Sequence, residues 1–242
     1  MTPTFAFAAY PYIALAVFCF GILLRFLLVQ RQITTVKAKL QEVWAVLDGS
    51  KLWCIGTALL LLGHLIGTAF PRQILSWDKN TIRLYVLEGL LFAIGVVTLA
   101  SCVGLIWRYL KVSDDSLAVE VATAAFLATT FVALLSGLLM SAFYRWGSFW
   151  GVVTLRPYAV SLLQGAPAPK FAMQMPFLVR LHIFSSFTLF ALVPFTRLAS
   201  FAVLALHWVT RRMSKSAAEF GDALGMWLQR YAPTTWIWPE ED

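Results

Sequence analysis

Two histidines lie within long apolar stretches of the sequence. His64 lies in GHLIGTAF and His182 in RLHIFSSF, whereas the third histidine, His207, precedes the basic segment TRRMSK. An ionisable side chain in an apolar span is costly and is by default a functional candidate. A haem iron that is bound from both faces needs one imidazole from each of two helices. We therefore ask which helices hold His64 and His182, and at what depth.

The composition is that of a membrane protein. Hydrophobic residues make up 60% of the 242 residues and charged residues 13%, far from the balance of a soluble domain. The net charge of +7 is interpreted as basic loops beside anionic lipid, and no nucleic-acid partner is expected. The three cysteines form no CxxC pair and indicate neither a disulfide framework nor a zinc or iron–sulfur site.

Five stretches are long enough to cross a hydrocarbon core of about 30 Å, which takes about 20 helical residues. They span residues 10–29, 52–69, 84–107, 117–143 and 177–207. We expect an all-α integral membrane protein, a five-transmembrane-helix bundle. Residues 1–210 would form the five-span membrane domain and residues 211–242 a cytoplasmic tail. The connection before the last stretch combines Gly, Pro and aromatic residues, which favours short amphipathic pieces on the outer surface.

Basic residues indicate the direction of the chain, because they favour the cytoplasmic side. The first, third and C-terminal connections carry Arg31, Lys37, Lys39, Lys51, Arg108, Lys111, Arg211, Arg212 and Lys215. The opposite connections carry Arg72, Lys79, Arg83, Arg145, Arg156 and Lys170. This moderate bias predicts that the N-terminus lies outside and the C-terminus in the cytoplasm.

On this layout the two apolar histidines share a depth. At 1.5 Å per residue, His64 lies about 10 Å and His182 about 8 Å below the outer ends of their spans. This predicts axial ligation of one haem b iron by His64 and His182. Gly63 and Gly67 flank the first ligand at small-xxx-small spacing, which lets a flat macrocycle or a neighbouring helix approach the backbone. The alternatives are a hydrogen-bonded core histidine and a tight helix crossing.

Other charged residues have candidate roles near such a haem. Arg180, Arg197 and Arg25 could hold haem propionates, because guanidinium groups bind carboxylates at two points; the alternative for each is a side chain that reaches the membrane interface. Glu88, about one turn into the third span, could accept a proton from a quinol. Its alternative is an ion pair with Arg83, Lys79 or Arg72. His207 is interpreted as a polar histidine at the inner interface.

Three segments carry a resemblance to a known family. The segments YPYIALAVFCFGILLRF, GHLIGTAFP and RLHIFSSFTLFALVPFTRL, with the five-span layout, resemble the gamma subunit of respiratory nitrate reductase over nearly the whole chain. The resemblance implies a membrane cytochrome b in a bacterial or archaeal cytoplasmic membrane. It further implies two stacked haems with two histidine ligands each, quinol oxidation beside the outer haem, and electron transfer to an iron–sulfur subunit and a molybdenum-containing catalytic subunit.

The sequence departs from that pattern at one of the two haems. His64 and His182 match the ligands of the outer haem, whereas Cys54 and Ser200 stand where the inner pair would be. Because both losses concern one haem, we expect a single-haem variant; ligation by a Cys54 thiolate is the alternative. The family uses a basic residue near the start of the third span at its quinol site, and Arg83 or Lys79 could serve there.

Two rival functions stay open from the sequence alone. The first is the membrane electron-transfer subunit of a related complex that acts on sulfur compounds or heterodisulfides. The second is a membrane anchor that has kept the fold without the haem, since a fold does not guarantee a function.

Overall fold

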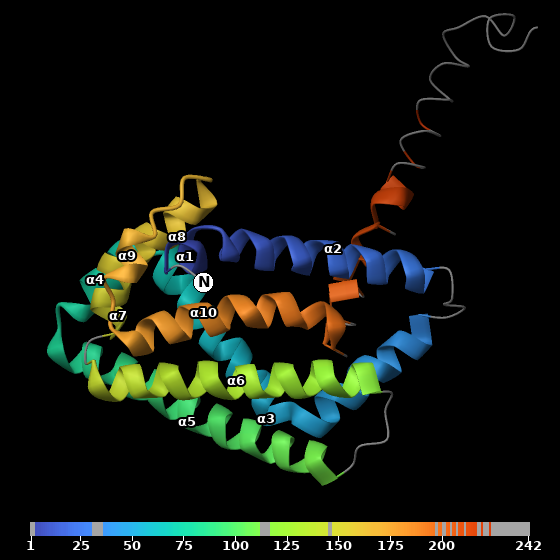
Figure 1. Ribbon diagram of the computed structural model, residues 1–242, viewed down its shortest axis with the longest axis horizontal. Helices are drawn as coiled ribbons and strands as arrows, with labels where there is room; N and C mark the ends of the chain where they lie inside the picture. Colours follow the sequence, from blue (N-terminus) through green and yellow to red (C-terminus); the bar gives the residue numbers. More distant parts are fainter. Residues whose placement is uncertain are drawn as a thin grey trace, which may run out of the picture.

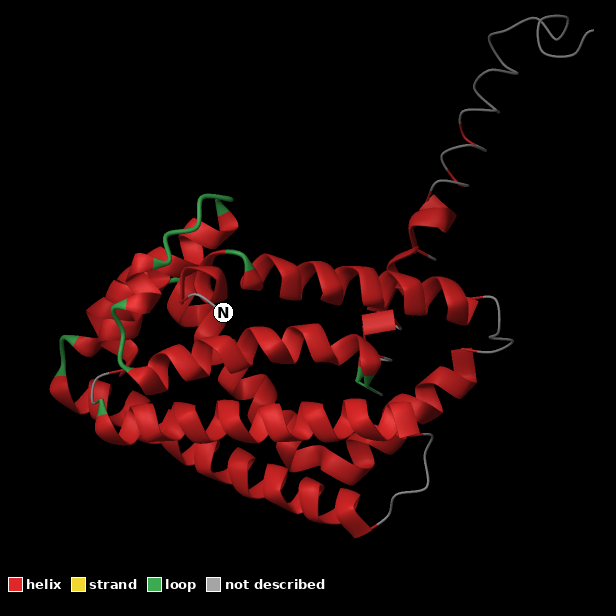
Figure 2. Ribbon diagram, in the orientation of Figure 1, coloured by secondary structure: helices red, strands yellow, loops and turns green. Residues whose placement is uncertain are grey.

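The computed structural model describes residues 3–30, 36–111, 117–144 and 147–196, with scattered residues between 198 and 223. Within residues 28–30, 36–49 and 117–120 it describes the backbone alone. All elements in these ranges are helical (Figure 2). In chain order they are α1 (Pro3–Ala8), α2 (Tyr10–Gln30), α3 (Val36–Ala69), α4 (Pro71–Asp78), α5 (Thr81–Lys111), α6 (Leu117–Phe143), α7 (Gly147–Trp150), the π-helix η1 (Gly151–Leu155), α8 (Arg156–Leu163), α9 (Lys170–Met173), α10 (Phe177–Leu192) and the 3₁₀ turn η2 (Val193–Phe195).

Five helices in the described part of the chain are long and apolar enough to cross a membrane, which confirms the predicted number of spans. They are Tyr10–Leu27 in α2, Ser50–Ala69 in α3, Thr81–Lys111 in α5, Val121–Phe143 in α6 and Phe177–Phe195 in α10 and η2. Large apolar side chains are exposed on all five, most of them on α2, α3 and α5, as expected where lipid rather than water surrounds a bundle.

The long helices form one bundle that is capped at one end by the short helices. α2 packs against α10, α10 against α6, α6 against α5, and α5 against α3, which crosses behind α6 and α10 in Figure 1. The short helices α1, α4, α7, α8 and α9 gather at the end of the bundle on the left of Figure 1. We refer to them, together with η1, as the end cap. The predicted short pieces before the last span are therefore confirmed.

Local sequence signals explain where several helices begin and end. The side-chain oxygen of Asn80 accepts hydrogen bonds from the backbone N–H groups of Ile82 and Arg83, at 3.0 and 3.3 Å, and so caps the N-terminus of α5. Proline occupies the first turn of α4 and of α8, where its missing N–H costs nothing. Gly165, with φ of +71°, ends the turn after α8, a conformation that glycine adopts without strain.

The end of the fifth span corrects one prediction. The sequence predicted a helix through residue 207, but α10 ends at Leu192, a 3₁₀ turn follows, and Thr196 is extended with φ of −107° and ψ of 169°. The reason is Pro194, which cannot donate a backbone hydrogen bond and disfavours a continuous helix. His207 and the predicted cytoplasmic tail lie outside or largely outside the described residues.

Arg25 of α2 stabilises this break. Its Nη1 donates hydrogen bonds to the carbonyl oxygens of Pro194, at 3.1 Å, and Thr196, at 2.6 Å. Pro194 also packs against Gly21, where an added Cβ would lie 2.6 Å from the proline Cβ. Because a span end leaves carbonyl groups without helical partners, the guanidinium supplies the donors that the interrupted helix lacks.

We expect Arg25→Ala to lower the free energy of unfolding by about 2 kcal/mol, because hydrogen bonds from a charged donor to two carbonyl groups are lost. The measurement is thermal unfolding in detergent micelles, followed by circular dichroism. Arg72→Ala is the control, since Arg72 is exposed on α4 and surface changes usually stay within about 0.5 kcal/mol. Equal midpoints for the two variants would contradict this role for Arg25.

Candidate metal centre

The structure brings His64 and His182 together. Their ring centroids are 6.0 Å apart with an interplanar angle of 23°, although His64 lies on α3 and His182 on α10. An iron with two Fe–N bonds of about 2 Å on one axis would separate the two nitrogens by about 4 Å and the ring centroids by about 6 Å. The observed separation therefore fits two imidazoles that share one metal ion.

Hydrogen bonds at the other nitrogen of each ring favour the same arrangement. His64 Nδ1 lies 2.7 Å from the carbonyl oxygen of Leu60, and His182 Nδ1 lies 2.8 Å from that of Ala133. Since a carbonyl only accepts, Nδ1 carries the proton in both rings and donates it. Nε2 then presents a lone pair, which is the usual state of a metal-ligating histidine whose second nitrogen is held by a carbonyl.

Small residues make room for the rings. A Cβ added at Gly137 of α6 would lie 3.1 Å from Cε1 of His182, so the glycine lets the imidazole lie directly against the α6 backbone. Side chains of other helices pack against the two glycines that flank His64. A Cβ added at Gly63 would lie 3.2 Å from the Leu91 side chain of α5, and one added at Gly67 would lie 4.0 Å from the Val152 side chain of η1. His64 itself is exposed and His182 half-buried, so the pair lies at the margin of the bundle.

Side chains fill the region around Cys54, where the resemblance would place one ligand of a second, inner histidine pair. Cys54 belongs to a cluster whose buried members are Trp53, Cys102 and Phe126, with exposed fractions of 6%, 0% and 7%. The ring of Trp53 meets Phe126 edge-on, with centroids 6.2 Å apart, and the Cys54 sulfur lies 3.4 Å from the Ser50 hydroxyl. Leu189 and Leu192 of α10 complete the cluster. Ser200, the other replaced ligand, lies outside the described residues.

The structure describes two of the three predicted propionate partners, Arg25 and Arg180. Arg25 binds the break after α10, about 18 Å along that helix from His182 at 1.5 Å per residue. Arg180 precedes His182 by two residues, which places it about 200° around the helix from the ligand; its Nε is shielded from solvent and has no hydrogen-bond partner. Arg197 lies outside the described residues. None of the three has a described contact with either imidazole.

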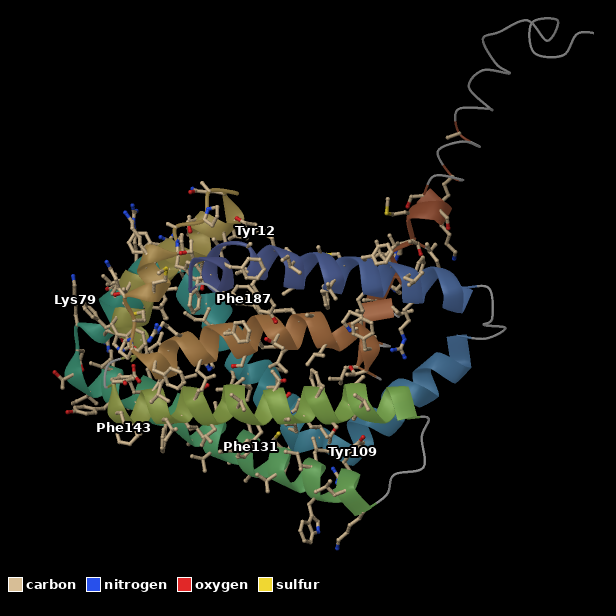
Figure 3. The ribbon with its side chains drawn as sticks, viewed as in Figure 1. Tyr12, Lys79, Tyr109, Phe131, Phe143 and Phe187 are labelled. Carbon is tan, nitrogen blue, oxygen red and sulfur yellow. The ribbon has the colours of Figure 1, made fainter. Side chains whose placement is uncertain are left out.

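Glu88 joins α5 to the end cap. Its Oε1 accepts a 2.6 Å hydrogen bond from the backbone N–H of Ser148 in α7. Leu91, one turn further along the same face of α5, packs against Gly63, so Glu88 lies about one turn nearer to the end cap than His64. Arg83 lies with its guanidinium 5.2 Å from the ring centroid of Trp77, at the end of the bundle where Lys79 is drawn in Figure 3.

Asp78, at the end of α4, is a second carboxylate close to Glu88. Neither of its oxygens is accessible to solvent or makes a hydrogen bond of good geometry. Burial raises the pKa of Asp78, the neighbouring Ser148 side chain lowers it in part, and the charge of Glu88 raises it further. This proximity could not be predicted from the sequence, because Asp78 and Glu88 belong to different helices.

The sequence analysis did not predict two further residues near the histidines, Arg156 and Gly137. Arg156, the first residue of α8, donates from Nε to the carbonyl oxygen of Thr68, at 3.0 Å, and Thr68 in turn donates from its hydroxyl to the carbonyl oxygen of His64, at 2.9 Å. Gly137 was the second. Its segment, LLSGLLMS, contains small residues, but no sequence signal shows which helix they face. Among the described residues no cluster of three or more His, Cys, Asp or Glu could hold a metal.

Comparison with known proteins identifies a family over most of the chain. A family model described as nitrate reductase gamma subunit matches residues 3–216. The respiratory nitrate reductase 2 gamma chain of Escherichia coli strain K12 is 29% identical over 220 residues, which cover 86% of this chain and 93% of that protein. The chain and this relative are therefore similar over nearly their full lengths.

The raised pKa of Asp78 predicts the pH dependence of stability. A carboxyl group whose pKa is higher in the folded state than in the unfolded state binds more protons when the protein is folded. Its contribution to folding stability is complete below the unfolded pKa of 3.8 and is lost as the pH rises through the folded pKa. We expect Asp78→Asn to raise the unfolding midpoint at pH 7 more than at pH 4, measured by thermal unfolding in micelles. An equal effect at both values would show that the Asp78 carboxylate is not destabilised by burial.

Proposed function

Because the chain belongs to the nitrate reductase gamma subunit family, we propose that it binds one haem b between His64 and His182 and serves as the quinol-oxidising membrane subunit of an oxidoreductase. Membership of this family makes it a membrane cytochrome b component of electron transfer. The observation that carries the proposal is the pair of facing imidazoles, 6.0 Å apart, each with Nδ1 bound to a carbonyl.

The protein's own groups fix the ligands before the haem binds. The Leu60 carbonyl orients His64 from within α3, and the Ala133 carbonyl orients His182 from α6. Both bonds hold the tautomer that offers Nε2, so little reorganisation is needed for ligation. When bound, the haem supplies a one-electron carrier. Gly137 keeps the His182 ring against α6, which fixes one side of the site.

The packing of the inner half supports a single haem. A haem needs a flat space with a ligand on each face, whereas Trp53, Phe126 and Cys102 fill the region beside Cys54 with side chains. The interruption of α10 at Pro194 comes just before the segment that would carry the second inner ligand. Both features belong to the part of the chain where the sequence lacks the inner histidines.

Quinol oxidation would take place on the outer side of the histidine pair. Oxidation of a quinol releases protons as well as electrons, and a carboxylate near the level of the haem can accept one of them. Glu88 is the candidate acceptor, because it lies about one turn outside the level of His64 and is held in place by Ser148. Arg83, at the start of α5, is the candidate for positioning the quinol, and exposure leaves its guanidinium accessible.

The electrons would pass to an iron–sulfur subunit and a molybdenum-containing catalytic subunit, as the resemblance to a gamma chain of respiratory nitrate reductase suggests. The excess of basic residues in alternate connections supports an N-terminus outside and a C-terminus in the cytoplasm of a bacterial or archaeal cell. On that orientation the end cap faces outward. The pair of histidines then lies in the outer half of the membrane.

We expect His64→Ala and His182→Ala each to abolish the reduced-minus-oxidised b-type absorption band, because removing either imidazole removes one axial ligand of the same iron. Cys54→Ala is the matched control and should keep the band, since its sulfur is a packing group in the cluster with Trp53. A band that survives in either histidine variant, or a wild-type protein without a band, would contradict the proposal.

Glu88→Gln separates proton uptake from anchoring. Glutamine keeps a side-chain oxygen that can accept the Ser148 N–H bond, but it cannot take up a proton. We expect an unchanged b-type band and a quinol oxidation rate that falls by about 100-fold, the lower end of what a general base contributes. The rate is followed with a reduced quinol analogue and the purified complex. A rate within about twofold of wild type would remove Glu88 from the proton path.

A further inference from the structure

An arginine other than the three predicted propionate partners is linked to His64 by hydrogen bonds. Arg156 donates from Nε to the carbonyl oxygen of Thr68, at 3.0 Å, and the Thr68 hydroxyl donates to the carbonyl oxygen of His64, at 2.9 Å. Arg156 is therefore attached to the helical turn of α3 that starts at His64. At 1.5 Å per residue, Thr68 lies about 6 Å outward of the ligand.

The position of Arg156 is fixed by its backbone as well as by its side chain. Its N–H donates to the carbonyl oxygen of Gly151 and closes the π-helical turn η1, and such turns are frequent at functional sites. Within this turn Val152 is buried and packs beside Gly67 of α3. Earlier in the same segment, the backbone N–H of Ser148 in α7 donates a hydrogen bond to Glu88 of α5. The segment that carries Arg156 is thus attached to both α3 and α5.

The outer part of the guanidinium is available for an anion. A guanidinium has five N–H donors, of which the bond to Thr68 uses the one on Nε. Within the described part of the chain the Nη groups of Arg156 have no hydrogen-bond or ion-pair partner, and the residue is only half-buried. The Nη groups are the part of arginine that binds a carboxylate at two points.

We infer that Arg156 binds a propionate of the haem held by His64 and His182. This inference rests on the proposed function. A haem carries its carboxylates on one edge, and Arg156 is the described arginine that is hydrogen-bonded to the turn following a ligand. The predicted partners fit less well: Arg25 binds the carbonyls after α10, and Arg180 lies about 200° around α10 from His182. The cation of Arg156 would favour the reduced haem.

The competing role is a helix cap. Thr68 supplies one of the last carbonyls of α3 (Val36–Ala69), and an arginine that binds such a carbonyl stabilises a helix end without any cofactor. A cap affects stability alone, whereas a propionate partner also affects the electrostatic potential at the haem. The haem midpoint potential therefore separates the two roles.

The experiment is a redox titration of the purified full-length protein, comparing wild type, Arg156→Gln and Arg72→Gln. Arg72 is an exposed arginine of α4 in the same end cap. For Arg156→Gln we expect the b-type band to be kept and the ratio of reduced to oxidised haem at a fixed ambient potential to fall about tenfold, which is about 59 mV for a one-electron couple. For Arg72→Gln we expect the wild-type potential.

A wild-type potential in Arg156→Gln would overturn the inference, including the case in which the variant unfolds more easily as a cap mutant would. A wild-type protein without any b-type band would instead refute the proposed function. If Arg156→Gln does not fold, the wild-type apoprotein is titrated with haem and with haem dimethyl ester. Binding of the ester at least about tenfold weaker supports a carboxylate contact, and equal binding contradicts it.

Discussion

The structure depends on the contact between two imidazoles that reach each other from helices far apart in the sequence. Each ring has its Nδ1 bound to a backbone carbonyl, and the two ring centroids lie 6.0 Å apart. With Nδ1 held by a carbonyl, each ring keeps an Nε2 lone pair that is available as a ligand. A metal ion between the rings would use both lone pairs at once, and the proposed function rests on this arrangement.

The same contact divides the bundle into two unlike halves. Around and outside the histidines, glycines, a π-turn and hydrogen-bonded charged groups hold α3, α5, α6 and the end cap in register. Farther along the bundle, the cluster around Trp53 and Phe126 fills the interior with side chains, and the last described span stops at Pro194. The half of the bundle near the end cap therefore holds the hydrogen-bonded groups around the histidines. The opposite half combines apolar packing with the hydrogen bonds from Arg25 to the carbonyl oxygens of Pro194 and Thr196.

Much of this could be predicted from the sequence because membrane helices have strong one-dimensional signals. Apolar length gave the five spans, and the rise per residue placed His64 and His182 at one depth. Contacts between helices have no such signal. Nothing in the order of residues shows that Ala133 offers its carbonyl to His182, that Gly137 faces the same ring, or that Asp78 lies beside Glu88. Nor does it show that Arg25 reaches the carbonyl oxygens of Pro194 and Thr196, or that Arg156 reaches that of Thr68. An arginine near an apolar run can reach several acceptors, and packing alone selects one. The break at Pro194 was missed because apolar composition continues past it.

The measurement that tests the central claim most directly is the molar ratio of haem b to polypeptide in the purified protein, by pyridine haemochrome assay against quantitative amino-acid analysis. A bundle with one imidazole pair and a filled inner half predicts a ratio close to one. A ratio close to two would mean that a second haem is held without the inner histidines, and a ratio close to zero would mean that the facing rings bind no haem.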